Sequence, residues 1–417
     1  MTDSSLTHHQ ADLVIAGAGM AGASLAHLLA PAMADGMRVV LLDRQQISSD
    51  ADVMDRPPSF DGRATALSWG TRLILEHMGC WQAMADRACA IEHIQVSDRG
   101  RFGQTHLHAA EQNTEALGYI VENAVLGHAL LNDIRALPEL QILDNTQVTD
   151  IRMTAAGASL QLDNGERLDT RLLVLADGAR SGLAARLGIR HDRQDYGSVA
   201  LVTQVHTDRP HGHWAYERFN DTGPVAFLPL QERSFAVVWT IPADDIAEVM
   251  AQPDSVLIER LQAIIGWRAG HILAIGERAS YPLALVRSQE QVRRSLVLLG
   301  NAAHSLHPVA GQGFNLALRD TAVLAEYLLE CWSRRGDPGD LTMLQAYARQ
   351  QQEDQRNTIL ASDWLPRVFS HPGTLTAFAR DTGLLALSAA PVVRRLLARH
   401  AMGLGHRAAR LDYGESS

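Results

Sequence analysis

The hydrophobic positions of this chain follow two patterns, which predict two kinds of β-sheet. Short, nearly continuous apolar runs are typical of parallel strands that are buried on both faces. There are four such runs, at residues 11–17 (ADLVIAG), 38–43 (RVVLLD), 171–176 (RLLVLA) and 295–299 (SLVLL). Apolar and polar residues alternate over 91–97, 198–205 and 235–241, as they do in antiparallel strands with one covered face. We therefore expect one parallel and one antiparallel sheet.

Helical spacing of apolar residues connects these strands. Small residues over 19–30 predict a helix that Pro31 ends, and residues 243–266 also carry helical spacing. A strand, a glycine turn, a helix and a second strand within the 33 residues 11–43 form a βαβ unit, which implies a parallel sheet. From Asp340 onward the chain is predicted to be helical, with breaks at Pro366, Pro372 and Pro391.

The first glycine turn carries the earliest sign of chemistry. Residues 17–22 (GAGMAG) match the dinucleotide-binding pattern GxGxxG. Gly17 permits the tight turn, Gly19 lets the backbone approach a pyrophosphate, and Gly22 lets helix and strand pack closely. The helix N-terminus offers N–H groups to phosphates. Asp43 follows Gly22 by 21 residues, where a carboxylate accepts hydrogen bonds from ribose and repels a 2′-phosphate. The motif predicts ADP binding; the alternative is a glycine turn without a ligand.

Two later segments favour FAD over NAD. They are ADGARS at 176–181 and GNAAH at 300–304, the second of which continues through PVAGQGFN at 308–315 into a predicted helix. Asn301 is placed to hold ribityl hydroxyls. The helix that opens at Gly311 and Gly313 could face the pyrimidine edge of a flavin, where negative charge develops on reduction. Asp177-Gly178, taken alone, is more typical of a turn.

The order and spacing of these three motifs resemble the single-component flavin aromatic hydroxylases, the para-hydroxybenzoate hydroxylase class, over nearly the whole chain. Within that class, four segments are similar to the ubiquinone-biosynthesis hydroxylases typified by 2-polyprenyl-6-methoxyphenol hydroxylase. These are FDGRATALS at 60–68, VSDRG at 96–100, YPL at 281–283 and LGNAA at 299–303. The wider class has aspartate where this chain has Asn301, and an amide oxygen can still accept the ribityl hydrogen bond.

The resemblance implies FAD as cofactor, NAD(P)H and O2 as cosubstrates, and ring hydroxylation of a polyprenyl (methoxy)phenol through a flavin C4a-hydroperoxide. The flavin would carry the chemistry, so no catalytic side chain is assigned. The implied cofactor contacts are Gly17, Gly19, Gly22, Asp43, Arg63, Glu122, Asp177, Gly178, Asn301, Gly311, Gly313 and Asn315. The residues implied near the isoalloxazine are His304, Pro308, Gly311, Gln312 and Gly313. Arg63 suits a pyrophosphate through its planar guanidinium, whereas Glu122 could equally be part of an ordinary helix cap.

Pattern and resemblance together predict an α/β fold with an α+β insertion. A Rossmann-type FAD-binding domain with a parallel sheet would comprise 11–90, 116–190 and 282–335. An interleaved antiparallel-sheet domain that binds the substrate would comprise 91–115 and 191–281, and 336–417 would form a helical C-terminal region. Aromatic residues between Arg209 and Trp239 are more typical of a core, although a few should line the substrate pocket.

Charge and cysteine content exclude several other classes. Lysine and arginine number 37 against 47 acidic residues, a net charge of −10, and no basic run occurs, so nucleic-acid binding is not expected. Three cysteines without a CxxC pair indicate reduced thiols and a cytoplasmic location. The sequence has no HExxH or similar ligand spacing, so we expect no metal. It also has no GxSxG nucleophile motif.

The chain has neither a signal-peptide pattern nor an apolar run long enough to span a membrane. Peripheral contact with the inner membrane is still an expectation, because residues 384–397 combine apolar side chains with two arginines as an interfacial helix would. A helix packed on the domain is the alternative. Other ubiquinone-biosynthesis proteins are expected partners. Two rival functions stay open: a flavin-dependent dehydrogenase or reductase on the same fold, and a non-catalytic flavin-binding scaffold of the biosynthetic complex.

Overall fold

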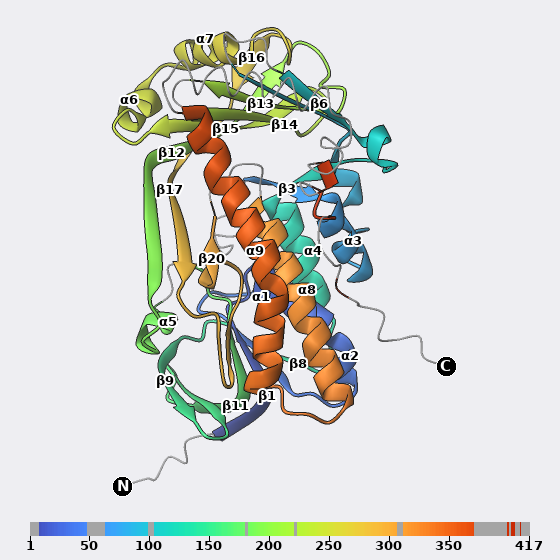
Figure 1. Ribbon diagram of the computed structural model, residues 1–417, viewed down its shortest axis with the longest axis vertical. Helices are drawn as coiled ribbons and strands as arrows, with labels where there is room; N and C mark the ends of the chain where they lie inside the picture. The colour runs from blue at the N-terminus through green and yellow to red at the C-terminus, as the bar shows by residue number, and fades with distance from the viewer. Residues whose placement is uncertain are drawn as a thin grey trace.

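The computed structural model describes residues 8–47, 63–98, 104–179, 182–220, 223–306, 312–370, 398–399, 402–404 and 409. Within these residues the chain forms an eight-stranded, a nine-stranded and a three-stranded sheet, with helices packed against them (Figure 1). We refer to these as the parallel sheet, the antiparallel sheet and the small sheet. The predicted fold class, an α/β protein with an interleaved antiparallel sheet, is confirmed.

The parallel sheet is built around β1 (His8–Ala16). Its parallel neighbours are β2 (Val39–Leu42) and β11 (Arg167–Leu175). Beyond β2 the sheet continues with β8 (Leu140–Leu143), and beyond β11 it continues with β19 (Leu296–Leu298), both also parallel. Antiparallel strands β9 (Val148–Thr154), β10 (Gly157–Leu162) and β18 (Val292–Arg293) complete it. Alternate residues enter separate cores on the two faces, which is why these strands have continuous apolar sequences: Leu13 and Ile15 on one face, Val14 and Ala16 on the other.

Helices cover one face of the parallel sheet. They are α1 (Met20–Leu28), α2 (Ala30–Ala34), α4 (Asn123–Arg135), α8 (Gln312–Ser333) and α9 (Leu341–Ser370). Pro31 does not end the helical region as predicted. It lies in the first turn of α2, where a missing N–H removes no hydrogen bond. The predicted break at Pro366 is also wrong, because α9 continues to Ser370 and loses only one backbone donor near its end. Pro372 and Pro391 lie outside the described residues.

The antiparallel sheet combines segments from both halves of the chain. Its strands are β5 (His93–Asp98), β6 (Gln104–His108), β12 (His191–Thr207), β13 (Trp214–Asn220), β14 (Gly223–Pro229), β15 (Ser234–Pro242), β16 (Ile272–Ile275), β17 (Ala279–Ser288) and β20 (His304–Ser305). The expected antiparallel pairing holds for β5 with β6, but β5 is parallel to β13. Helices α6 (Ile246–Ala251) and α7 (Asp254–Ile265) cover one face, at the top of Figure 1.

The small sheet joins the two larger sheets. It consists of β3 (Ala64–Ser68), β4 (Cys89–Ile91) and β7 (Gly118–Glu122), and α3 (Trp69–His77) follows β3. Ala64, Ala66 and Ile120 of the small sheet pack with Ala215 and Leu228 of the antiparallel sheet. Short helical elements complete the described fold: η3 (Ala85–Arg87), η4 (Ala109–Gln112), α5 (Leu183–Arg186) and η5 (Gly300–Ala302).

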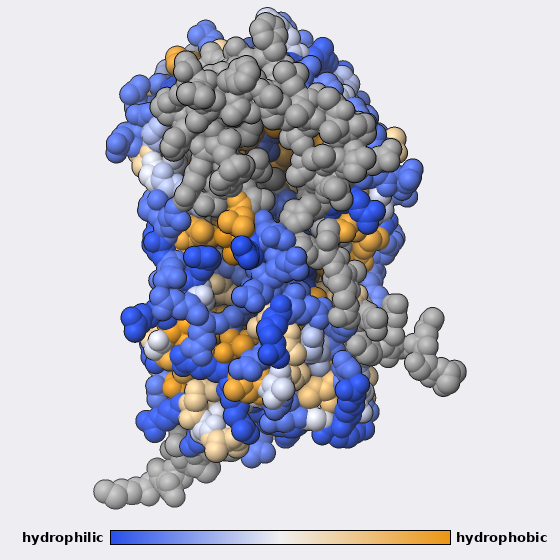
Figure 2. Space-filling model, viewed as in Figure 1, coloured by the Kyte–Doolittle hydropathy of each residue, from blue (hydrophilic) through white to orange (hydrophobic). Residues whose placement is uncertain are grey.

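Each large sheet takes strands from separate stretches of sequence, as an interleaved chain requires, and the domain boundaries given above stay a prediction. On the coloured part of the face in Figure 2, apolar side chains lie in small groups among hydrophilic ones. Among the described helices, none is long and apolar enough to cross a membrane.

Candidate functional site

The carboxyl ends of the parallel strands bring most of the predicted cofactor residues to one edge of the sheet. The Gly17 N–H donates to the Leu42 carbonyl at 2.8 Å, and the Ala176 N–H donates to the Ala16 carbonyl at 2.8 Å. The turns after β1, β2, β11 and β19 therefore lie next to one another, where open α/β sheets bind their ligands. The residues brought to this edge are Gly17, Gly19, Gly22, Asp43, Asp177, Gly178 and Asn301.

The first turn can be made only with glycine. Gly17 has φ +112°, and a Cβ atom there would lie 2.6 Å from the Ala176 carbonyl oxygen. A Cβ atom at Gly22 would lie 1.9 Å from the Gly17 carbonyl oxygen, so α1 and β1 approach as closely as backbones can. Gly19 precedes α1 and offers no side-chain cap, and the first turn of α1 has no acidic residue. These features fit a pyrophosphate at the N-terminus of α1.

Asp43 is fixed by its own turn. Its Oδ2 accepts the Ala18 N–H at 2.7 Å, and its Oδ1 accepts the Gln45 N–H at 2.9 Å. The carboxylate thus ties the end of β2 to the glycine turn after β1. Each oxygen has a second lone pair, and the side chain is partly exposed. This geometry fits the role predicted for Asp43, which is to accept hydrogen bonds from ribose hydroxyls.

Asp177 lies close enough to Asp43 for their charges to interact. Burial first, and the Asp43 carboxylate second, raise the pKa of Asp177 to about 7 against an opposing backbone hydrogen bond. Gly178 has φ +86° with open space beside its Cα, so glycine is needed for its backbone conformation and not for a close approach. Near neutral pH, a carboxyl with this pKa can donate or accept a hydrogen bond at the edge of the sheet.

Arg63 and Glu122 lie at the neighbouring ends of β3 and β7. The Arg63 guanidinium lies over the Tyr281 ring, 4.5 Å from its centroid, in cation–π geometry. Glu122 forms an ion pair with Arg87, with 3.4 Å between Arg87 Nη2 and Glu122 Oε2. Tyr281 belongs to the antiparallel sheet, so Arg63 lies where the small and antiparallel sheets meet. The cofactor contacts implied for Arg63 and Glu122 stay predictions.

At the start of α8, one residue predicted to contact the cofactor is used to hold the fold together, and others lie in more open surroundings. Asn315 is almost fully buried: its Oδ1 accepts the Ser68 N–H and its Nδ2 donates to the Ala66 carbonyl, both at 2.8 Å. This amide therefore holds α8 against β3. Gly313 has open space around it, and Gln312 begins the helix. Two residues predicted to lie near the isoalloxazine, Pro308 and Gly311, are outside the described residues.

His304, also predicted near the isoalloxazine, is held by a buried polar network. Its Nε2 lies 2.6 Å from Asp320 Oδ2. Asp320 also accepts hydrogen bonds from Gln351 at 2.7 Å and from Gln355 at 2.9 Å. The network links β20 with α8 and α9, so residues of two helices hold the His304 side chain in place. The sequence analysis missed Asp320 and both glutamines because nothing local indicates their pairing.

One face of the antiparallel sheet points toward Arg63 and the small sheet. Strand register places five residues side by side on this face: Val96, Glu217, Ala226, Val238 and Val202. Each is partly exposed, whereas Phe227 and Val237 on the opposite face are fully buried under α6 and α7. We call these five residues the open row.

Two contacts fix the direction in which the open row faces. Tyr281, which is in register with Ala200 on the same face, contacts Arg63. Ala215, two residues before Glu217 and therefore on the same face, packs against the small sheet. The open row lies between these contacts. It is an apolar surface of small side chains that contains one carboxyl group.

Glu217 is the charged residue of the open row, and the sequence analysis missed it. Burial raises its pKa to about 7, although part of its surface stays accessible. No hydrogen-bond or ion-pair partner lies near its carboxyl group within the described part of the chain. Alternation over 214–220 puts Glu217 in phase with Ala215 and Phe219, but the other phase contains Arg218, so the sequence alone does not single out Glu217.

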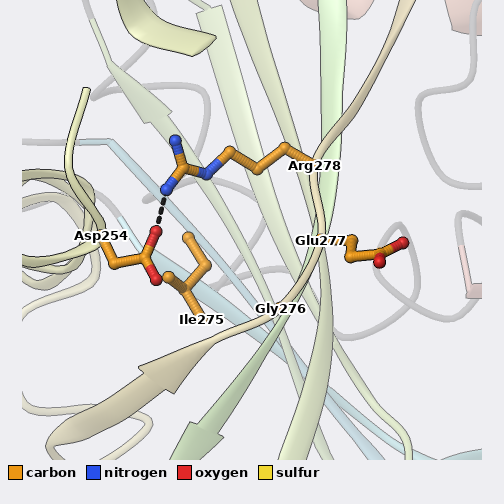
Figure 3. A pocket seen from close by; sticks show the side chains of 5 residues that line it. All are labelled: Asp254, Ile275, Gly276, Glu277 and Arg278. Carbon is orange, nitrogen blue, oxygen red and sulfur yellow. Dashed lines mark hydrogen bonds and ion pairs between the residues drawn. The ribbon is translucent and has the colours of Figure 1, made fainter. Parts of the chain in front are cut away.

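An open pocket of about 510 Å³ lies elsewhere, where β16 leads into β17 (Figure 3). Arg278 and Asp254 point toward each other across it and form an ion pair, and Glu277 points away. Arg278 also donates to the carbonyls of Met250 and Gln252. Its guanidinium is thus used to fasten β17 to α6 and α7, and the pocket is separate from the edge of the parallel sheet.

The fold and the glycine-rich edge define a dinucleotide-binding flavoprotein. Residues 10–357 match the family described as "FAD binding domain", so the chain belongs to that family. The crystal structure of p-nitrophenol 4-monooxygenase PnpA from Pseudomonas putida has the same fold, with a TM-score of 0.79 at 19% identity over 96% of this chain and 100% of that one.

Relatives of higher identity narrow the family. Ubiquinone hydroxylase UbiL of Rhodospirillum rubrum is 34% identical over 394 residues, which cover 94% of this chain and 90% of UbiL. The 3-demethoxyubiquinol 3-hydroxylase of Escherichia coli is 28% identical over 405 residues, covering 96% of this chain and 100% of that enzyme. The chain therefore belongs to the ubiquinone hydroxylase family of FAD-dependent monooxygenases, as the resemblance predicted.

Proposed function

We propose that this protein hydroxylates the ring of a polyprenyl (methoxy)phenol in ubiquinone biosynthesis, using FAD, O2 and NAD(P)H. The observation that carries the proposal is that the fold holds two surfaces, the glycine-rich edge and the open row with its single carboxyl group. The names and activities of the relatives, which include a ubiquinone hydroxylase and a demethoxyubiquinol hydroxylase, support the substrate class.

The residues at the edge fit FAD. The turn at Gly17 and Gly22 would hold the pyrophosphate on backbone N–H groups, and Asp43 would accept hydrogen bonds from the adenosine ribose. Asn301 has an exposed side chain after β19 and would accept a ribityl hydroxyl. When bound, the flavin would supply the electrons that activate O2, and one oxygen atom of O2 would be inserted into the ring. The chain itself binds and orients the two partners.

The open row fits the substrate. Valine and alanine side chains give a ring and its isoprenoid tail an apolar surface. Glu217, with its pKa of about 7, would accept a hydrogen bond from the phenolic hydroxyl. Such a hydrogen bond increases electron density at the ortho and para ring carbons, which are the positions that attack an electrophilic oxygen.

The deciding experiment uses purified FAD-loaded protein, a short-chain prenylphenol, NAD(P)H and ¹⁸O2. We expect one labelled oxygen atom per product molecule by mass spectrometry, with NAD(P)H oxidised in step. Product formed without O2 would identify a dehydrogenase or reductase. A folded, flavin-loaded protein that neither consumes NAD(P)H nor forms product would identify the scaffold. A Gly22→Val variant, which should lack FAD, is the control.

A polyprenyl substrate also suggests where in the cell the protein works. An isoprenoid tail partitions into lipid, so an enzyme that acts on it benefits from peripheral contact with the membrane or from receiving the substrate from another biosynthetic protein. The segment considered for this contact, 384–397, lies outside the described residues. Flotation with liposomes of the full chain and of a chain truncated at about residue 381 tests this part: equal binding would remove the segment from the proposal.

A further inference from the structure

A cysteine and two histidines meet where the small sheet joins the antiparallel sheet. Cys89 lies on β4, and His211 and His213 lie in the connection between β12 and β13. Each offers one ligand atom, and these atoms all lie within 4.8 Å of one another. The sequence hides this cluster because 122 residues separate Cys89 from His211.

We infer that Cys89, His211 and His213 form a binding site for a divalent metal ion that prefers sulfur and imidazole ligands, with Zn²⁺ as the best match. At Zn–S of about 2.3 Å and Zn–N of about 2.0–2.1 Å, tetrahedral geometry separates the sulfur and nitrogen ligands by roughly 3.6 Å. The distance between Cys89 Sγ and His211 Nε2 is 3.7 Å. This pair is at the spacing that a shared metal ion requires, and the other two pairs of ligand atoms lie within 4.8 Å.

His213 has the support that a metal ligand needs. Its Nδ1 lies 3.1 Å from the Ala90 carbonyl oxygen, an acceptor, so the ring proton is on Nδ1. The lone pair of Nε2 is then available, and a backbone carbonyl fixes the ring, as in most protein metal sites. Glu92 Oε1 lies 3.9 Å from this Nε2 but outside the three-residue cluster, so it would reach the ion through a water molecule or after a side-chain movement.

His211 must rearrange on binding. Its Nδ1 accepts the His213 N–H at 3.0 Å, so in the metal-free protein its proton is on Nε2 and points toward Cys89. A metal ion on Nε2 moves that proton to Nδ1 and breaks this hydrogen bond. The thiol proton of Cys89 is also released to solvent. We therefore expect a site that binds more weakly than one whose ligands are already in place.

Metal binding would hold two parts of the fold together. Cys89 belongs to the small sheet, whose β3 strand follows Arg63. The two histidines directly precede β13 of the antiparallel sheet, which carries the open row. A shared ion would fasten these two sheets together. The site does not depend on the proposed hydroxylase activity, because its ligands are outside the glycine-rich edge and the open row.

Metal binding can be measured without turnover on the full-length, FAD-loaded protein. After chelation, desalting, addition of Zn²⁺ and removal of the excess, we expect one Zn²⁺ per chain by elemental analysis. We also expect a rise in melting temperature on Zn²⁺ addition and a sulfur-to-cobalt charge-transfer band with Co²⁺. Cys89→Ser should lose the band and weaken Zn²⁺ binding by more than about 100-fold, because loss of an outer-shell partner alone weakens a site by 10–100-fold.

Cys331→Ser is the matched control, since Cys331 is also a half-buried free cysteine but lies on α8. It should bind like the parent protein. If Cys89→Ser fails to fold by circular dichroism, His213→Gln takes its place and should show the same loss. No Zn²⁺ binding at micromolar concentrations by the parent, or equal binding by parent and folded Cys89 or His213 variants, would overturn the inference.

Discussion

Replacing Gly22 tests the most constrained contact of the cofactor site. A Cβ atom at this position would lie 1.9 Å from the Gly17 carbonyl oxygen and 3.2 Å from Ile15 Cγ2. Real Cβ atoms essentially never come within 3.0 Å of another heavy atom, so even alanine requires a movement of at least about 1.1 Å. The Gly17 carbonyl is part of the tight turn and cannot move. The start of α1 must therefore move away from the edge of the sheet.

The expected loss follows from the N–H groups that this retreat withdraws. One hydrogen bond to a charged phosphate contributes about 1.5–3 kcal/mol, which corresponds to roughly 10- to 100-fold in the dissociation constant. Overpacking adds a stability loss of about 1–3 kcal/mol. Gly22→Ala should therefore bind FAD weakly, and Gly22→Val, which is larger and β-branched, should bind none.

Fluorescence titration of FAD-free protein with FAD measures this affinity, and thermal unfolding of the same samples measures stability. Gly182→Ala is the matched control, because Gly182 has an ordinary φ of −88° and open space beside its Cα. It should behave like the parent. A Gly22→Ala protein with parental FAD affinity and flavin content would refute the close-approach argument and the site built on it.

Three further predictions concern single side chains. Arg63→Ala should weaken FAD retention in a titration without unfolding the chain, at a cost of about 0.5–1 kcal/mol for the lost Tyr281 contact; unchanged affinity would contradict the cofactor contact. The raised pKa of Asp177, about 7, favours the protonated folded state, so FAD-free protein should lose stability as the pH rises from about 4 to 7, by up to about 1.4 kcal/mol per pH unit. Asp177→Asn should reduce that slope in urea unfolding, and equal slopes would contradict the assignment. Glu217→Gln should lower the rate of ring hydroxylation about 100-fold and remove its pH dependence near 7, while FAD binding stays intact; an unchanged pH profile would contradict the role in the substrate site.

The sequence predicted the features that depend on neighbouring residues. Residues 11–17 and 171–176 are almost continuously apolar because both faces of the parallel sheet are buried, so their pattern alone indicates parallel strands. The glycine turn was also predictable, since Gly22 excludes a Cβ atom because of Gly17, only five residues away, and Gly17 needs a positive φ for the tight turn. Asp43 followed from the standard length of a βαβ unit.

Contacts between distant segments could not be predicted in this way. Asn315 accepts a hydrogen bond from the backbone of Ser68, 247 residues away. The sequence around a helical asparagine does not indicate which residue it will bond to. The same holds for Cys89 and His211. Alternation in β5 correctly indicated a strand with one covered face, but it carries no information about direction, so the parallel pairing with β13 was missed.

At Glu217, the register of the strands gives information that the alternation of apolar and polar residues in the sequence does not. In WAYERFN, both phases of the strand contain a charged residue, and the sequence does not say which face is covered by helices. Arg218 is on the face under α6 and α7, where its Nη1 donates to Ser97 at 3.1 Å. Glu217 is on the opposite face, where its burial raises its pKa and so disfavours the folded state as the pH rises toward 7.

A neutral glutamine at this position would remove that cost, so stability alone gives no reason for a carboxyl group on an apolar surface. A substrate hydroxyl that hydrogen-bonds to the carboxylate does give a reason, because it supplies a partner that the described residues do not. Glu217→Gln should accordingly have opposite effects on two measurements, raising stability at neutral pH and lowering hydroxylation. A variant that loses stability as well as activity would mean that Glu217 supports the fold instead of the substrate.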